Sequence, residues 1–131
     1  MKEPKEDSLI SIAEKETIRK LDAFENIDKN NMQKIIENGK ILNFKEGWPL
    51  SNIDEINSNI YFILNGTARL LESNNNKLLS IEKLNAGDSI GLSSLIRGEP
   101  CEQVSASTKL KVFAITFLAV SVSSFSHLDH T

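Results

Sequence analysis

The sequence predicts an α+β fold that is mainly β, with helices before and after a small barrel. Two observations carry this prediction. The segment up to Gly39 contains two stretches whose apolar residues recur at helical spacing. After Gly39, about seventy residues consist of short apolar or alternating segments bounded by turn residues. Strands this short and evenly spaced are typical of a sandwich or barrel, not of a parallel sheet with long crossovers.

Two helices are expected before the barrel and one after it. The first covers residues 8–21, where an apolar stripe runs among Glu and Lys, and the second covers residues 24–38, with Asp28 as its N-cap. Asn38-Gly39 is a favourable helix stop. A further helix is expected over residues 116–126, capped by Thr116. The charged residues 1–7 are expected to be frayed.

Six strands and one further short edge strand are expected, with hairpin turns between some of them. Asn65-Gly66 and the cluster at 73–76 have hairpin chemistry, because Asn and Gly tolerate positive φ. Residues 45–52 contain Gly47, Trp48 and Pro49, which predicts a turn followed by a short edge strand. The six expected strands are residues 40–44, 60–64, 67–72, 78–83, 103–107 and 109–115.

Length and composition restrict the class of protein. The 131 residues suit one domain with a real core, divided here into a helical lead-in (1–22), the barrel domain (23–126) and a tail (127–131). A net charge of −3 argues against a nucleic-acid surface, which is usually basic. The single cysteine favours a reducing, cytoplasmic setting. No apolar run approaches the ~20 residues of a membrane helix, and the N-terminus does not resemble a signal peptide.

The segment 87–107, called the cradle below, is the expected ligand site. It begins G-D-S-I-G, continues through an apolar turn at 92–96, breaks at Gly98 and Pro100, and returns to an alternating pattern. A helix that begins directly after a glycine turn presents free N–H groups, which suit an anion. The sequence therefore predicts strand, glycine turn, short helix, loop and strand, arranged to hold a small anionic ligand.

Several landmarks occur together in one order. They are F-E-N-I at 24–27, K-E-G at 45–47, I-Y-F-I-L-N-G at 60–66, G-D-S-I-G at 87–91, and the apolar strand at 112–115. In this order they resemble the cyclic-nucleotide-binding domain family, over about residues 24–120. The family includes catabolite-activator-like regulators, kinase regulatory subunits and gated channels. The resemblance implies a jelly-roll barrel, the double-stranded β-helix, with helices at both ends.

The cradle departs from the family's phosphate-binding cassette at its charged positions. The family has an acidic residue after the second glycine, which holds the ribose, whereas Leu92 stands here. Counting back from Val104, the family's arginine position falls on Pro100 and its Ser/Thr position on Cys101. A phosphate without the guanidinium loses charge-assisted hydrogen bonds of about 1.5–3 kcal/mol each. We therefore expect no ordinary binding of cAMP or cGMP.

The variant cassette has a second resemblance. Residues 94–102 and 106–108 resemble the cassette of cyclic-nucleotide-like domains fused to toxin- and peptide-secretion ABC transporters. This implies an N-terminal regulatory module at the cytoplasmic face of a membrane protein.

Seven residues form the predicted ligand-binding set. For Arg97 the alternatives are a role in the cradle or a solvated loop. For Ser93 and Ser94 they are anion binding or helix capping. Glu102 is expected to face solvent or to pair with Arg97, and Cys101 is expected to be a buried small residue instead of a redox thiol. The set is Gly91, Leu92, Ser93, Ser94, Arg97, Cys101 and Glu102.

No catalytic constellation is found. The only histidines, His127 and His130, lie in the tail, so a metal-dependent cupin enzyme is not expected. We expect no enzyme activity, metal or cofactor. The predicted function is regulation of an attached or partner protein such as an ABC transporter. The domain would either sense a small anionic metabolite or act through protein contacts alone, and it could form a homodimer. The alternative is the sensor half of a catabolite-activator-like transcription regulator, which would need a dimer helix and a helix-turn-helix after the barrel.

Overall fold

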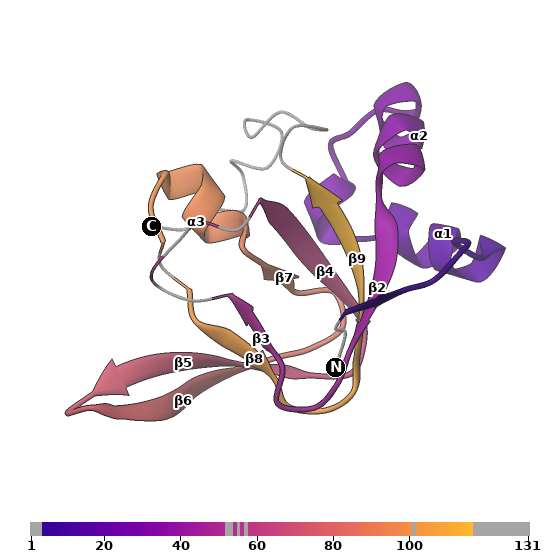
Figure 1. The fold of residues 1–131 in the computed structure, drawn as a ribbon. Helices are drawn as coiled ribbons and strands as arrows, with labels where there is room; N and C mark the ends of the chain where they lie inside the picture. Colours follow the sequence, from indigo (N-terminus) through magenta and orange to yellow (C-terminus); the bar gives the residue numbers. More distant parts are fainter. Residues whose placement is uncertain (1–3, 52–53, 55, 57, 101, 117–131) are drawn as a thin grey trace.

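The computed structural model describes residues 4–51, 54, 56, 58–100 and 102–116. They form two antiparallel sheets, with α1 (Ile12–Arg19) and α2 (Lys29–Asn38) together at one side and the short α3 (Leu92–Arg97) apart from them (Figure 1). One sheet has the strand order β1-β2-β9-β4-β7, and the other has the order β3-β8-β5-β6. The strands are β1 (Lys5–Glu6), β2 (Lys40–Phe44), β3 (Pro49–Ser51), β4 (Asn59–Asn65), β5 (Ala68–Asn74), β6 (Lys77–Leu84), β7 (Ser89–Ile90), β8 (Val104–Ala106) and β9 (Leu110–Thr116). The predicted mainly-β jelly roll is confirmed.

Helix α1 (Ile12–Arg19) begins later than the apolar stripe predicts. Ser11 is its N-cap and forms a capping box with Glu14, in which each side chain accepts a hydrogen bond from the other residue's N–H. Leu9 and Ile12 are 82% and 80% exposed, so these two apolar residues do not pack on the domain. Ile18, by contrast, is fully buried.

Helix α2 (Lys29–Asn38) begins at the predicted cap. The Asp28 carboxylate accepts a hydrogen bond from the Asn31 N–H at 2.8 Å. A short 3-10 helix (Asp22–Phe24) precedes it, so the helical stretch expected from residue 24 is interrupted. Gly39 follows the last residue of α2, and glycine is needed there because a Cβ would collide with the Phe113 ring.

The first sheet is buried on both faces. Its outer face packs against the helices through Phe62, Phe113 and Ile41, and the Phe24 ring from the connecting segment lies 4.9 Å from that of Phe62. Its inner face fills the barrel together with residues of the second sheet, such as Ala106. This is why β4 is almost continuously apolar instead of alternating.

Two turns with similar chemistry have different outcomes. Asn75 and Asn76 have φ values of 52° and 65° and connect β5 to β6, which confirms the hairpin expected at 73–76. Asn65-Gly66 does not close a hairpin, because β4 pairs with β7 and β9 while β5 belongs to the other sheet. Gly66 is required there since a Cβ would collide with the Lys109 carbonyl oxygen.

The N-terminal segment is more ordered than its charge suggests. Lys5–Glu6 forms β1, which pairs antiparallel with β2, so the expectation of fraying is wrong for these residues. The Lys111 ammonium on β9 lies 3.6 Å from Asp7 and 3.1 Å from Glu14. This lysine therefore links the first strand, α1 and the sheet. The helix expected over 116–126 lies almost wholly outside the described residues.

Substituting Glu14 tests this link through its pH dependence. The Ser11 N–H, and then the Lys111 ammonium, lower the pKa of the Glu14 carboxyl below its ordinary value of 4.5. A depressed pKa gives stability that is present above pH 4.5 and is lost as the pH falls through the folded-state pKa. Glu14→Gln is therefore expected to lower the free energy of unfolding by about 0.5–1 kcal/mol at pH 7. In urea denaturation this difference should vanish in acid, whereas the exposed Glu16→Gln should leave the profile unchanged.

Candidate functional site

The glycine turn at 85–88 holds the cradle against β4. The Asp88 carboxylate accepts a hydrogen bond from the Asn85 N–H at 2.7 Å, as expected for a turn-forming aspartate. The Gly87 N–H donates to the Ile63 carbonyl and the Ile63 N–H to that of Asp88, at 2.8 and 2.9 Å. The chain then passes through β7 and arrives at Gly91 in a fixed position.

Gly91 lies directly before the short helix α3 (Leu92–Arg97). Its φ of +94° is left-handed, and a Cβ would be 3.1 Å from the Asn59 carbonyl oxygen at the start of β4. Both the conformation and the close approach require glycine. Gly98, with φ +73°, ends the helix after six residues. The predicted order of strand, glycine turn, short helix and loop is therefore confirmed.

The start of α3 is occupied by a carboxylate from the same chain. The Gly91 N–H donates to Glu102 Oε2 at 2.9 Å, and the Ser93 N–H donates to Glu102 Oε1 at 3.2 Å. The Ser51 hydroxyl donates to the Glu102 backbone carbonyl at 3.2 Å, which ties the segment to β3. Glu102 thus holds the N–H groups that the sequence offers to an anion, instead of facing solvent or pairing with Arg97.

The other predicted residues divide between the core and the surface. Leu92 is 3% exposed and belongs to the hydrophobic cluster beneath α1 and α2. Ser94 is buried and Ser93 is half-buried. Arg97 is exposed at the far end of α3, ~7.5 Å along the helix axis from Leu92, and within the described part of the chain it forms no ion pair. Cys101 lies outside the described residues. The structure therefore brings Gly91, Ser93 and Glu102 together, and leaves Arg97 apart.

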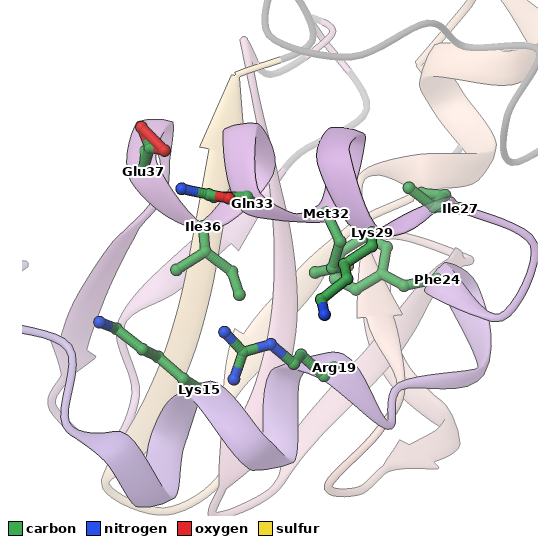
Figure 2. A pocket seen from close by; sticks show the side chains of 9 residues that line it. All are labelled: Lys15, Arg19, Phe24, Ile27, Lys29, Met32, Gln33, Ile36 and Glu37. Atoms are coloured by element: carbon green, nitrogen blue, oxygen red, sulfur yellow. The ribbon is translucent and has the colours of Figure 1, made fainter.

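A separate groove of about 610 Å³ lies between α1 and α2 (Figure 2). Lys15 and Arg19 reach into it from α1, and Lys29 reaches from the start of α2. Its floor is apolar, formed by Phe24, Met32 and Ile36. None of the predicted ligand residues that the structure describes lines it.

The described residues were also searched for a metal site and for a membrane-spanning helix. Within these residues, no group of three or more His, Cys, Asp and Glu side chains is arranged to hold a metal ion. Across the same part of the chain, no helix has the length and apolar character needed to cross a bilayer.

Comparisons with known proteins place the fold. Neither a protein-family model nor a curated protein matches the chain. Solved structures do match. The regulatory domain of Toxoplasma gondii PKA, crystallised with cAMP, superimposes with a TM-score of 0.77 at 21% identity, over 87% of this chain and 46% of that one. A cyclic nucleotide-binding-like protein from Brucella abortus superimposes with a TM-score of 0.66 at 16% identity, over 87% of this chain and 95% of that one.

A third match is the regulatory subunit of a cAMP-independent protein kinase A from Trypanosoma brucei. It gives a TM-score of 0.75 at 12% identity, over 86% of this chain and 43% of that one. A variant of that subunit, with glutamate-to-alanine, threonine-to-arginine and valine-to-alanine substitutions, is bound to cAMP in its A site. This chain spans less than half the length of either kinase regulatory chain.

These matches agree with the observed topology. The two sheets, the helices that precede them and the short helix after the glycine turn occur in one continuous arrangement. The chain therefore has the fold of a cyclic-nucleotide-binding domain.

Proposed function

We propose that this chain is a regulatory domain that acts through protein contacts and does not respond to cyclic nucleotides. The observation that carries the proposal is the Glu102 carboxylate on the Gly91 and Ser93 N–H groups. These groups have their anionic partner already. A phosphate at the same place would have to displace the carboxylate, or approach it against like-charge repulsion.

The neighbouring side chains support the same conclusion. Leu92 stands where the family pattern places an acid, and its buried side chain has no group that can accept a ribose hydroxyl. Pro100 stands at the expected arginine position and carries no charge. The exposed Arg97 lies at the opposite end of α3 from Glu102. A nucleotide would thus lack both of its usual charged contacts.

The identity of the regulated protein stays a prediction. A regulatory role is supported by the fold, because the matched kinase chains are regulatory subunits or domains. None of the structures named above is a transporter, so attachment to an ABC transporter rests on the cassette resemblance alone. The sensor half of a transcription regulator remains the alternative. The full-length gene would distinguish them, by encoding either a transporter or a helix-turn-helix beside this domain.

Thermal shift with cAMP, cGMP and 2-oxoglutarate tests the proposal. A ligand at 100 times its dissociation constant stabilises a protein by about 2.7 kcal/mol, which is easily measured. We expect no saturable shift with any of the three, while the Toxoplasma gondii PKA regulatory domain, as the positive control, should respond to cAMP. A saturable response of this chain to either cyclic nucleotide would overturn the proposal.

A second variant tests whether residues of the cradle alone prevent the binding of cyclic nucleotides. Pro100→Arg and Glu102→Ala together supply a cation for the phosphate and remove the internal carboxylate, while Leu92 stays in the core. The cAMP-bound variant of the Trypanosoma brucei subunit supports this design, since it too gains an arginine and loses a glutamate. We expect the double variant to bind cAMP.

A further inference from the structure

Two cations lie directly opposite each other on the outer face of the second sheet. Arg69 on β5 pairs in register with Lys83 on β6. Their neighbours Ala68 and Leu84 point into the barrel, so Arg69 and Lys83 point outward. Opposed residues have Cβ atoms about 4.5–5.5 Å apart, and like charges at that spacing destabilise a sheet. Within the described residues, no carboxylate forms an ion pair with either side chain.

The cations border a cavity that is otherwise lined by hydroxyl groups. Its volume is about 390 Å³, and its lining consists of Thr67, Arg69, Ser80, Lys83, Ser107 and Thr108. Ser80 belongs to this face because a register shift after Leu70 brings it opposite Leu71, two residues beyond Arg69 on β5. The Ser107 Oγ is buried and has no hydrogen-bond partner in the described structure. A buried hydroxyl without a partner is uncommon and calls for a ligand or water.

The hydroxyl side of this cavity is held rigidly. The Thr67 N–H donates to the Thr108 hydroxyl at 3.0 Å, and the Ser107 N–H donates to the Thr67 carbonyl at 3.0 Å. The cavity is also distinct from the place where Glu102 meets the start of α3, although Ser107 is the last residue of the cradle segment. Gly91 lies against Asn59 at the first residue of β4, whereas Thr67 follows its last residue, and a strand of this length spans ~20 Å.

We propose that this cavity binds a small oxyanion of the phosphate class. A guanidinium binds phosphate oxygens through two parallel hydrogen bonds, and the lysine adds a point charge. The Thr67, Ser80 and Ser107 hydroxyls can donate to the remaining oxygens, whereas the Thr108 hydroxyl already donates to the Lys109 carbonyl at 3.0 Å. A bound dianion offsets the repulsion between Arg69 and Lys83. The volume lies within the range of small-molecule sites, so a phosphomonoester fits as well as free phosphate.

Titration with inorganic phosphate, followed by the backbone amide resonances at constant ionic strength, tests the site. Saturable shifts are expected at Thr67, Arg69, Ser107 and Thr108. Arg69→Gln and Lys83→Gln should each weaken binding about tenfold, the loss of one charge-assisted contact. Lys77→Gln, an exposed lysine at the other end of β6, should bind phosphate like the unsubstituted protein. Ribose 5-phosphate in a parallel titration distinguishes a phosphomonoester from free phosphate, and preference for either supports the site.

Thermal stability gives a second test, because Arg69→Gln and Lys83→Gln should have opposite effects without and with phosphate. Without phosphate and at low salt, Arg69→Gln and Lys83→Gln should raise the thermal midpoint, because each removes the repulsion. With phosphate, the unsubstituted protein should gain stability and the variants should not. Shifts that stay linear, or that are as large in Arg69→Gln and Lys83→Gln as in the unsubstituted protein, would overturn the proposal. Saturable shifts at Gly91 and Ser93 instead would overturn both this site and the proposed function, whereas cAMP binding with an intact phosphate site would overturn the function alone.

Discussion

Replacing Phe113 by alanine is expected to lower the free energy of unfolding by about 3–5 kcal/mol, a large part of a typical domain's stability. The Phe113 side chain is fully buried between β9 and the helices, and its ring lies 6.5 Å from that of Phe24 in an edge-on arrangement. The cavity left by truncation cannot close easily. On one side it faces Gly39, which has no side chain, and β9 is fixed by ladders to β2 and β4.

Urea denaturation monitored by circular dichroism measures this loss. Leu78→Ala is the matched control, because Leu78 is a large apolar residue that is 55% exposed on β6. Its truncation should change stability by about 0.5 kcal/mol or less. Equal costs for the two substitutions would mean that the helices do not pack on the first sheet through Phe113.

Replacing Glu102 by alanine is expected to lower the free energy of unfolding by about 1.5–3 kcal/mol, the range for hydrogen bonds to a charged group. The substitution leaves the Gly91 and Ser93 N–H groups without their acceptor. Amide hydrogen exchange should become faster at these two residues, and along β9 it should become faster only by the factor that the loss of global stability gives.

Glu99→Ala is the control for this substitution. Glu99 is also acidic, lies three residues earlier in the same loop, and is exposed. It should leave both stability and exchange at Gly91 unchanged. If Glu102→Ala also leaves exchange at Gly91 and Ser93 unchanged, the carboxylate does not occupy the cradle in solution, and the proposed function loses its main support.

Local chemistry was sufficient to predict much of the fold. The Asp28 cap, the hairpin at Asn75-Asn76 and the apolar strands follow from residue preferences that act within a few positions. The same reasoning failed where the pairing of strands depends on segments that are distant in the sequence. Asn65-Gly66 has the residues of a hairpin turn, but β4 finds its partners in β7 and β9. Lys5–Glu6 has no strand preference and pairs because the edge of β2 is available.

The candidate site shows the same division. The glycines and the short helix were predictable because positive φ and close backbone approach require glycine. The position of the Glu102 carboxylate could not be predicted, because its hydrogen-bond donors lie nine and eleven residues earlier and no local pattern links them. A similar limit applies to Arg69 and Lys83. Their opposition depends on the register of β5 and β6, which the sequence does not specify by itself.

The tethered carboxylate also sets a threshold for any competing anion. Glu102 lies eleven residues after Gly91 in the same chain, so its carboxylate is an intramolecular ligand for the Gly91 and Ser93 N–H groups. The effective concentration of such a ligand is on the order of millimolar for a short flexible connection. An external anion of equal intrinsic affinity would occupy half of the molecules only at a comparable concentration. Signalling nucleotides at micromolar levels would therefore leave the domain in one state, and its behaviour would be constant in time unless a partner moved the segment that carries Glu102.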